Sequence, residues 1–217
     1  RPILVEGDDI TFVSDGRLGV HLAEKYLGFL KDASRGEFTA CAGVAITKTK
    51  YPFFRGYTLA EELCGNAKQR ANERGGGSWL DFHLLYGGLS GELTDIRERS
   101  YVTIDRASLI YGPYCCLDDA TNEYSIYHLK AGIDSFRDEE KWPHSKVKDF
   151  RAALSLGEVA AELFLLEMKG RGSEPYDQIP ERSYRKRGFK DKVTPYFEMI
   201  ELMEYYPEEF LKEKGEG

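Results

Sequence analysis

Four consecutive residues near the start of the chain carry the side chains best suited to catalysis. The chain opens RPILVEGDDITFV, in which two apolar runs flank the tetrapeptide Glu6-Gly7-Asp8-Asp9. This pattern predicts a hairpin of two antiparallel strands whose tip holds three carboxylates, because a tight turn brings such side chains together. Carboxylate oxygens are hard ligands that suit Mg²⁺ or Mn²⁺. Asp8 and Asp9 are therefore the predicted metal ligands.

A divalent metal site at this tip predicts phosphoryl-transfer chemistry. That reaction needs an in-line nucleophile and compensation of charge on the phosphoryl oxygens, and bound metal ions supply both. Gly7 leaves space for a triphosphate or a sugar next to the backbone. A structural interpretation stays open, since Asp-Asp is common in turns. For Glu6 three alternatives stay open: it crowds a nucleotide, adds a third ligand, or points into solvent.

The composition is that of a globular chain with an acidic balance. The 217 residues include 30 Lys and Arg against 37 Asp and Glu, which gives a net charge of −7. This length fits one domain, or one domain with an appended subdomain. The negative charge argues against general electrostatic capture of nucleic acid. Residues 181–192 are locally basic and residues 198–217 are acidic, and exposure on the surface is the simplest explanation of both.

Cysteine and histidine spacing argues against a disulfide framework and against structural zinc. Cys41, Cys64, Cys115 and Cys116 form no C-x-x-C pair, and the four histidines are scattered. A chain of this length does not need disulfides, so we expect reduced thiols and a cytoplasmic protein. No apolar run approaches the length of about 18 residues that spans a membrane. The chain begins with a predicted strand and without Met, and we expect the protein to continue upstream of Arg1.

The first part of the chain alternates strand patterns and helix patterns. The order that these patterns predict is strand 3–5, strand 10–13, helix 17–33, strand 38–46, helix 58–73 and strand 79–85. The helices have apolar residues at helical spacing, namely Leu18, Leu22, Tyr26, Phe29 and Leu30 in the first and Leu59, Leu63 and Ala67 in the second. With one strand and a helical connection in front, this order gives a ferredoxin-like βαββαβ unit, which is an α+β fold.

Two local features refine this prediction. Gly43, in the middle of a nearly continuous apolar run, indicates close approach by another backbone or a ligand. Residues 51–57, YPFFRGY, are predicted as a loop whose aromatic side chains either pack on the core or stack a base. Thr58 and Glu61 are spaced as a capping box at the start of the helix that follows.

The second part of the chain is predicted to be mostly helical. Short strands are predicted over 101–104 and 108–115, and helices over 124–138, 147–169 and 193–206. The helix 147–169 has an apolar face of Phe150, Leu154, Val159, Leu163 and Leu166, with Gly157 as a weak point. We therefore predict an α+β domain over 1–112 and a helical region over 113–217 that packs on it.

Four segments in this order resemble a known family. EGDDITFV, CAGVAITKTKYPF, YTLAEELCGNAK and SWLDFH are similar to the second palm domain of the large subunit of type III CRISPR effector complexes and to stand-alone palm proteins. This palm is a distant relative of the GGDEF diguanylate cyclases. The resemblance covers residues 1–86 closely, and WPHSKVKDFRAAL and TPYFEMIELMEYY extend it more weakly. Its specificity lies in the order of the segments and in no single one.

The resemblance implies a metal-dependent nucleotidyltransferase or cyclase that acts on ATP in antiviral defence. In the family the hairpin acids bind Mg²⁺ or Mn²⁺ beside the nucleotide, and an Asp on the first strand completes the site. By this resemblance Asp8 and Asp9 are catalytic metal ligands, and Gly7 and Lys68 bind the nucleotide. Lys68 has an alternative role as a plain cation near a helix end. Glu6 stands where the family has Gly, which puts turnover in doubt.

Two functional hypotheses therefore stay open. The first is an enzyme that makes cyclic nucleotides or cyclic oligonucleotides from ATP and needs a second palm or a homodimer partner, as the resemblance implies. The second is a palm without catalysis that senses a nucleotide or binds RNA or proteins of an effector complex. The Glu6 departure, the basic segment 181–192 and the aromatic stretch 51–57 motivate the second hypothesis.

Overall fold

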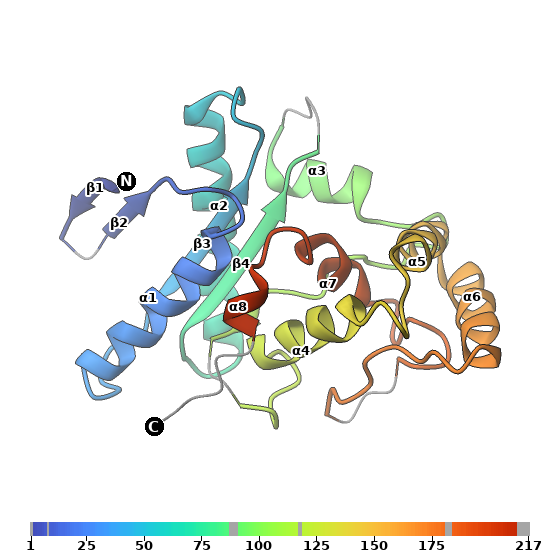
Figure 1. Ribbon diagram of the computed structural model, residues 1–217. Helices are drawn as coiled ribbons and strands as arrows, with labels where there is room; N and C mark the ends of the chain where they lie inside the picture. Colours follow the sequence, from blue (N-terminus) through green and yellow to red (C-terminus); the bar gives the residue numbers. More distant parts are fainter. Residues whose placement is uncertain (1, 8, 87–90, 117–118, 181–183, 212–217) are drawn as a thin grey trace.

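The computed structural model describes residues 2–7, 9–86, 91–116, 119–180 and 184–211 (Figure 1). The chain has an α+β fold, as predicted, with two small sheets and helices that outnumber the strands. No helix among the described residues is long and apolar enough to cross a lipid bilayer.

A three-stranded mixed sheet lies at the centre of the molecule. It has the order β3 (Cys41–Ile46), β4 (Trp79–Leu84) and β5 (Tyr114–Cys115). β3 runs parallel to β4, while β5 is antiparallel to β4. Every residue of β4 is buried, as expected for a strand covered on both faces, whereas most of β3 is half-buried because β3 is an edge strand of this sheet.

The predicted N-terminal hairpin forms a sheet of its own. β1 (Pro2–Glu6) pairs with β2 (Asp9–Phe12) in antiparallel register, with Glu6 opposite Asp9. Figure 1 shows this hairpin apart from the central sheet. The two apolar runs were therefore predicted correctly as a hairpin, but the described strands do not join into one ferredoxin-like sheet.

The first two helices cover opposite faces of β3. α2 (Phe53–Glu73) connects β3 to the parallel β4, and a Cβ atom added at Gly43 would run into the backbone of α2 at Ala60 and Cys64. On the other face, Val44 of β3 meets Gly19 at the start of α1 (Gly19–Ala33). Of the two explanations predicted for Gly43, close approach by another backbone is therefore confirmed, because only glycine lets α2 lie this near.

The buried face of α1 differs from the predicted one. The residues that α1 buries are Gly19, Val20, His21, Ala23 and Leu27. Leu22, Tyr26 and Phe29, which were predicted to face the core, are exposed. At Gly19 the helix approaches β3 closely, since an added Cβ would lie 3.0 Å from the Val44 side chain.

The start of α2 was predicted five residues too late. The helix begins at Phe53 after Pro52, whose fixed φ suits a helix start. Thr58 is not a cap, since its hydroxyl donates a hydrogen bond to the carbonyl of Phe54 inside the helix. The predicted apolar face of Leu59, Leu63 and Ala67 is buried and is confirmed.

The rest of the chain is mostly helical. Its helices are α3 (Leu93–Ser100), α4 (Ile126–Arg137), α5 (His144–Leu156), α6 (Glu158–Gly170), α7 (Tyr196–Leu202) and α8 (Glu208–Leu211). The predictions missed α3. The predicted strand over 101–104 is only an isolated bridge between Val102 and Ser108, and the predicted strand over 108–115 shortens to β5.

The predicted helix over 147–169 is divided at Gly157. This residue has a φ of 111°, a conformation that favours glycine, and it separates α5 from α6. The two helices pack on each other through the stacked rings of Phe150 and Phe164. Phe150 and Leu154 are buried as predicted, but Val159, Leu163 and Leu166 are exposed. The residues of α6 that face the core are Ala161, Leu165 and Met168.

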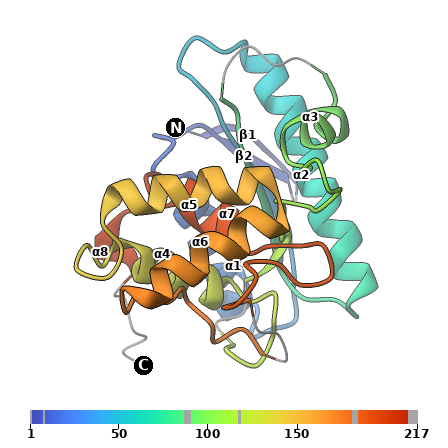
Figure 2. The ribbon, with the colours of Figure 1, turned by 90° about the vertical axis from the view of Figure 1, so that its right-hand side faces the viewer.

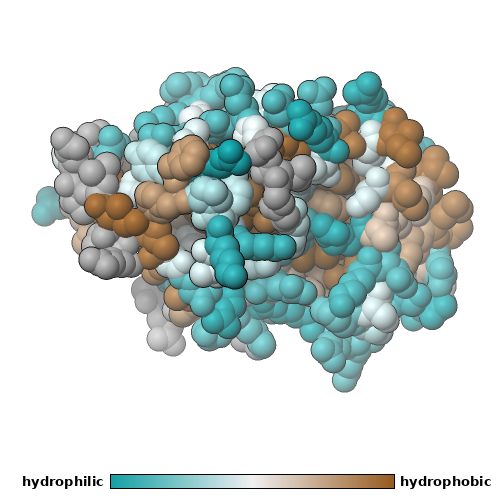
Figure 3. Space-filling view, turned by 90° about the horizontal axis from the view of Figure 1, so that it is seen from above, coloured by the Kyte–Doolittle hydropathy of each residue, from teal (hydrophilic) through white to brown (hydrophobic). Residues whose placement is uncertain are grey.

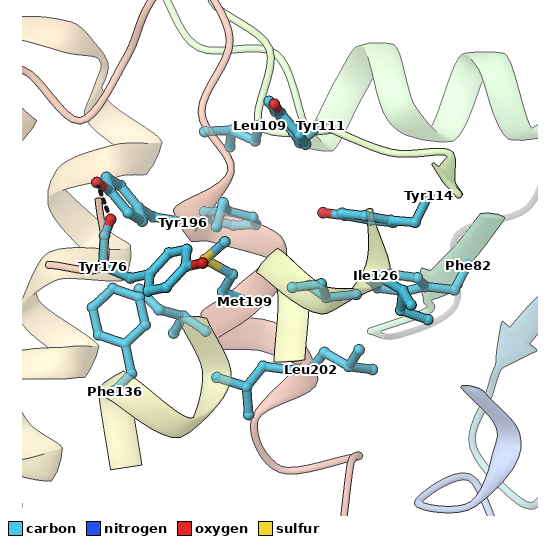
Figure 4. Close-up of a cluster of buried hydrophobic side chains, with 14 of the residues drawn as sticks. Phe82, Leu109, Tyr111, Tyr114, Ile126, Phe136, Tyr176, Tyr196, Met199 and Leu202 are labelled. Atoms are coloured by element: carbon cyan, nitrogen blue, oxygen red, sulfur yellow. Dashed lines mark hydrogen bonds between the residues drawn. The ribbon is translucent and has the colours of Figure 1, made fainter. Parts of the chain in front are cut away.

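One buried cluster joins the two parts of the chain. Figure 4 shows Phe82 of β4 and Tyr114 of β5 in the same cluster as Phe136 of α4 and Leu202 of α7. At its centre α7 approaches α4 so closely that a Cβ atom on Gly132 would clash with Met199. Because β5 lies beyond residue 112, the sheet itself crosses the predicted domain boundary, and the division into 1–112 and 113–217 stays a prediction.

Candidate functional site

The acidic tip predicted to bind metal is open to solvent at Asp9. Asp9 begins β2 and is exposed. Gly7 has a φ of 61°, and no atom lies within 4 Å of the place where a Cβ would be. Glycine at this position therefore suits the backbone conformation of the turn, and the space beside it is open as predicted. The predicted ligand Asp8 lies outside the described residues.

Four side chains form a stripe along α2, and two of them, Tyr57 and Cys64, lie within electrostatic reach of Asp9. Tyr57, Glu61, Cys64 and Lys68 are spaced by four, three and four residues, which places them on one face of the helix. A hydrogen bond to Glu61 raises the pKa of Tyr57, and the negative charge of Asp9 adds to this effect. The charge of Asp9 on the hairpin therefore acts on a side chain in the first turns of α2.

The predicted cation Lys68 and Asp9 act on the same residue of this stripe, Cys64. Burial raises the pKa of Cys64, the positive charge of Lys68 opposes that rise, and the charge of Asp9 adds to it. Lys68 also acts on Cys41 of β3. The charges of Asp9 and Lys68 therefore act on one thiol from two elements.

Lys68 is free to bind a ligand. Its side chain is exposed, and it forms no ion pair within the described part of the chain. The helix continues to Glu73, and the basic residue of its last turn is Arg70. The alternative role of Lys68 as a cation of the helix end is therefore weaker than the sequence indicated.

Cys64 and Cys41 are poor candidates for nucleophiles. The Cys64 thiol donates a hydrogen bond to the Cys41 carbonyl at 3.4 Å, and burial raises the pKa of both thiols. A raised pKa lowers the fraction of reactive thiolate. The four cysteines are free thiols. Cys64 and Cys41 therefore contribute to the contact between α2 and β3.

Glu61 is a further carboxylate at this site that the sequence reasoning missed. It was interpreted as half of a capping box, an assignment that failed because the helix begins earlier. The signal that could have found it is its spacing of seven residues from Lys68, which places both on one helix face. Among the described residues, no three His, Cys, Asp or Glu side chains are arranged to hold a metal ion. Asp9 and Glu61 nevertheless supply the hard oxygen donors that Mg²⁺ prefers.

The aromatic stretch before this stripe lines a cleft between α2 and α3. The cleft has a volume of about 340 Å³ and is lined by Tyr51, Phe54, Arg55, Glu62 and Ile96, among others. The Phe54 side chain is 67% exposed, with the Arg55 guanidinium 5.8 Å from its ring centre. Of the two alternatives for residues 51–57, core packing is therefore wrong for Phe54.

A second cleft lies further along the groove between α2 and α3. Its volume is about 480 Å³, and its lining includes Asn66, Arg97 and Tyr101. Arg97 donates two hydrogen bonds, at 2.8 and 2.9 Å, to the fully buried Asp81 of β4, and Asn66 donates a third at 3.2 Å. The oxygens of Asp81 therefore hold α3 to the sheet through Arg97.

Comparison with known proteins adds no family assignment. A scan against protein-family models finds no match, and a search of curated proteins finds none.

Proposed function

We propose that the chain is a palm domain that binds ATP together with Mg²⁺ or Mn²⁺ and transfers nucleotidyl groups, as the family resemblance implies. The observation that supports the proposal is that Asp9 and Lys68 are both exposed and that both charges act on Cys64. A carboxylate that binds metal and an ammonium group that binds phosphate are the two charges that a triphosphate needs at one site.

In this proposal each side chain has a defined role. Asp8 and Asp9 hold the metal, Glu61 adds a nearby carboxylate, and Lys68 neutralises phosphate charge. A bound divalent metal supplies charge stabilisation on the phosphoryl oxygens and lowers the pKa of an attacking hydroxyl. The open space beside Gly7 accommodates the nucleotide.

The proposed palm needs one more strand beside β3. In a split βαβ unit the two parallel strands leave room for another strand between them. Here β2, α1 and β3 follow that order, β2 is not paired with β3, and β3 is an edge strand. We infer that the ferredoxin-like sheet is completed by a strand between β2 and β3, and the resemblance implies that this strand carries an Asp.

The test is metal-dependent conversion of labelled ATP. The protein should form a product with Mg²⁺ or Mn²⁺, and Asp9→Ala should lower the rate on the order of 100-fold or more, because it removes a metal ligand. Asp15→Ala is the matched control, since Asp15 is also exposed but forms an ion pair with Arg17 at 2.8 Å. Product formation that is equal in the wild type and in Asp9→Ala would contradict the proposal.

A second candidate function is nucleotide or RNA binding without catalysis. Its support is the exposed aromatic cleft, in which Phe54 can stack a base and Arg55 can meet a phosphate. The Glu in place of Gly at position 6 also fits a palm that has lost turnover. Nucleotide affinity without any product would favour this candidate over the enzyme.

A further inference from the structure

The exposed side of α6 carries a continuous row of large aliphatic side chains. Leu156 at the end of α5 is 65% exposed, and on α6 Val159 is 72%, Leu163 63% and Leu166 68% exposed. Figure 3 shows hydrophobic surface gathered at the end of the molecule where Figure 1 places α6. We name these four residues the α6 stripe.

The α6 stripe is a second apolar face and is not part of the core. The opposite side of the helix, with Ala161, Leu165 and Met168, is already buried. Figure 2, which views this end directly, shows α5 and α6 in front of the rest of the molecule. A helix that is apolar on its outer face as well indicates an interaction surface, because isolated globular chains rarely leave such patches uncovered.

The spacing of the stripe is that of a coiled-coil seam. On α6 itself, Val159, Leu163 and Leu166 lie four and three positions apart, which is a d–a–d part of a heptad repeat. Leu156 lies before the break at Gly157, at the end of α5. Such side chains pack into the spaces between those of a second helix with the same pattern. The partner that the spacing fits best is therefore another copy of α6.

We propose that two copies of this chain associate through α6, with the two helices antiparallel about a two-fold axis. In this register Leu163 packs against Leu166 of the partner subunit, and the symmetry repeats the contact. Val159 lies over Gly170 of the partner subunit, where the absence of a side chain leaves room for it. The interface is the same patch on both copies, as a two-fold axis requires.

Charges beside the stripe select the antiparallel orientation. Glu162 and Lys169 lie on the same flank of α6, seven residues apart, and Glu167 lies on the other flank. Parallel helices would place Glu162 against Glu167 of the partner subunit, which is repulsive. Antiparallel helices place Glu162 against Lys169 of the partner subunit, twice in the dimer.

The two charged residues are available for this contact. The carboxylate of Glu162 is 3.9 Å from Arg187, and the Lys169 ammonium is 4.0 Å from Glu174, both at the outer limit of an ion pair. The side chains of Glu162, Arg187 and Lys169 are more than half exposed and that of Glu174 is 38% exposed. Such pairs contribute little to stability. Exchange of these weak partners for a contact across the interface therefore costs little.

The size of the stripe predicts a weak and reversible dimer. A row of four side chains covers a few hundred Å², less than the roughly 800 Å² per partner of a standard stable interface. We therefore expect a dissociation constant on the order of 10–100 µM. The α6 stripe lies at the end of the molecule opposite the hairpin (Figure 1), so this association is distinct from any pairing of palms and does not rest on the proposed function.

The test is sedimentation velocity of the chain between about 5 and 500 µM, a range that brackets the expected dissociation constant. The wild type should shift from monomer to dimer, and Leu163→Glu should weaken dimerisation at least about tenfold, because it buries a charge in the seam. Circular dichroism should show unchanged folding, since Leu163 is exposed in the monomer. Phe29→Ser, which alters an exposed aromatic residue on α1, is the control and should dimerise normally.

A charge exchange tests the orientation separately. Glu162→Lys and Lys169→Glu should each weaken the dimer, and the double variant should restore it, because the two changes together recreate the pair in reverse. A wild type that remains monomeric at the highest concentration would overturn the proposal. A dimer that Leu163→Glu leaves intact would overturn it as well, and a double variant without recovery would overturn the antiparallel register.

Discussion

At the scale of single residues, the most unusual group is the carboxylate of Glu198 on α7. It is buried, and one of its oxygens accepts hydrogen bonds from the backbone N–H groups of Tyr111 and Gly112 and from the Tyr114 hydroxyl. The other oxygen has no partner among the described residues. Burial raises the pKa of Glu198 to about 7, although the backbone donors and the charge of Arg97 oppose the rise.

This raised pKa predicts a pH-dependent stability. Between the ordinary glutamate pKa of 4.5 and the folded pKa of about 7, the folded state retains a proton that the unfolded state has lost. The contribution of Glu198 to the free energy of unfolding is therefore complete at low pH and is lost as the pH rises through 7. The loss is about 3 kcal/mol at most. Glu198→Gln stays neutral, so its free energy of unfolding relative to the wild type should increase from about pH 5 to pH 8.

Urea denaturation of both proteins across this pH range measures the difference directly. His83 changes stability in the opposite sense, because burial lowers its pKa to about 4 and its contribution is lost as the pH falls. That effect is common to the wild type and Glu198→Gln, so it cancels in the comparison. If the difference in free energy of unfolding between the two proteins stayed constant across this pH range, Glu198 would already be ionised in the folded state.

At the scale of elements, the contact between α2 and β3 positions the proposed site, because it fixes the stripe that ends at Lys68. This contact depends on Gly43, where an added Cβ would also lie 2.9 Å from the Leu63 side chain. Gly43→Ala should therefore push α2 away from the sheet and lower the free energy of unfolding by roughly 3 kcal/mol.

Gly28→Ala is the matched control for this substitution. Gly28 lies within α1, and nothing lies within 4 Å of its added Cβ. Alanine there should raise the free energy of unfolding by about 0.5–1 kcal/mol, because it reduces the conformational freedom of the unfolded chain. If urea unfolding midpoints moved equally in both variants, the close packing of α2 on β3 would not be a determinant of stability.

The elements also show which sequence signals were reliable. The hairpin, β3, β4 and the buried face of α2 follow directly from apolar runs and helical spacing. The faces of α1 and α6 were assigned wrongly because each helix carries large apolar side chains on an exposed side as well as on its buried side. Periodicity identifies an apolar face but cannot tell burial in the core from an outer stripe.

At the scale of the whole molecule, one core connects elements that are distant in sequence. α1 contacts the C-terminal region through Glu24, which accepts a hydrogen bond from Lys130 at 2.6 Å and pairs with the Tyr206 hydroxyl. His21 stacks on Phe210 with ring centres 3.8 Å apart. These contacts could not be predicted, because pairing between distant residues leaves no periodic signal in a single sequence.

The candidate site was predictable only in part for the same reason. Its acidic turn and Lys68 follow from the sequence and its resemblance, and in the structure the charges of Asp9 and Lys68 both act on Cys64. Glu61 was missed because its role depends on where α2 begins, and a helix start is the least certain feature of a sequence pattern. What pairs with the free edge of β3 could not be predicted, because none of the described strands pairs there.

The central claim is that Asp9 and Lys68 form one site for ATP and a divalent metal, and isothermal titration of ATP with Mn²⁺ tests it most directly. The wild type should bind ATP only when Mn²⁺ is present, and Asp9→Ala and Lys68→Ala should each weaken binding on the order of tenfold or more, because each removes one charge partner of the complex. Asp15→Ala should bind as the wild type does. ATP affinity that is independent of Mn²⁺ and unchanged in Asp9→Ala would contradict the account.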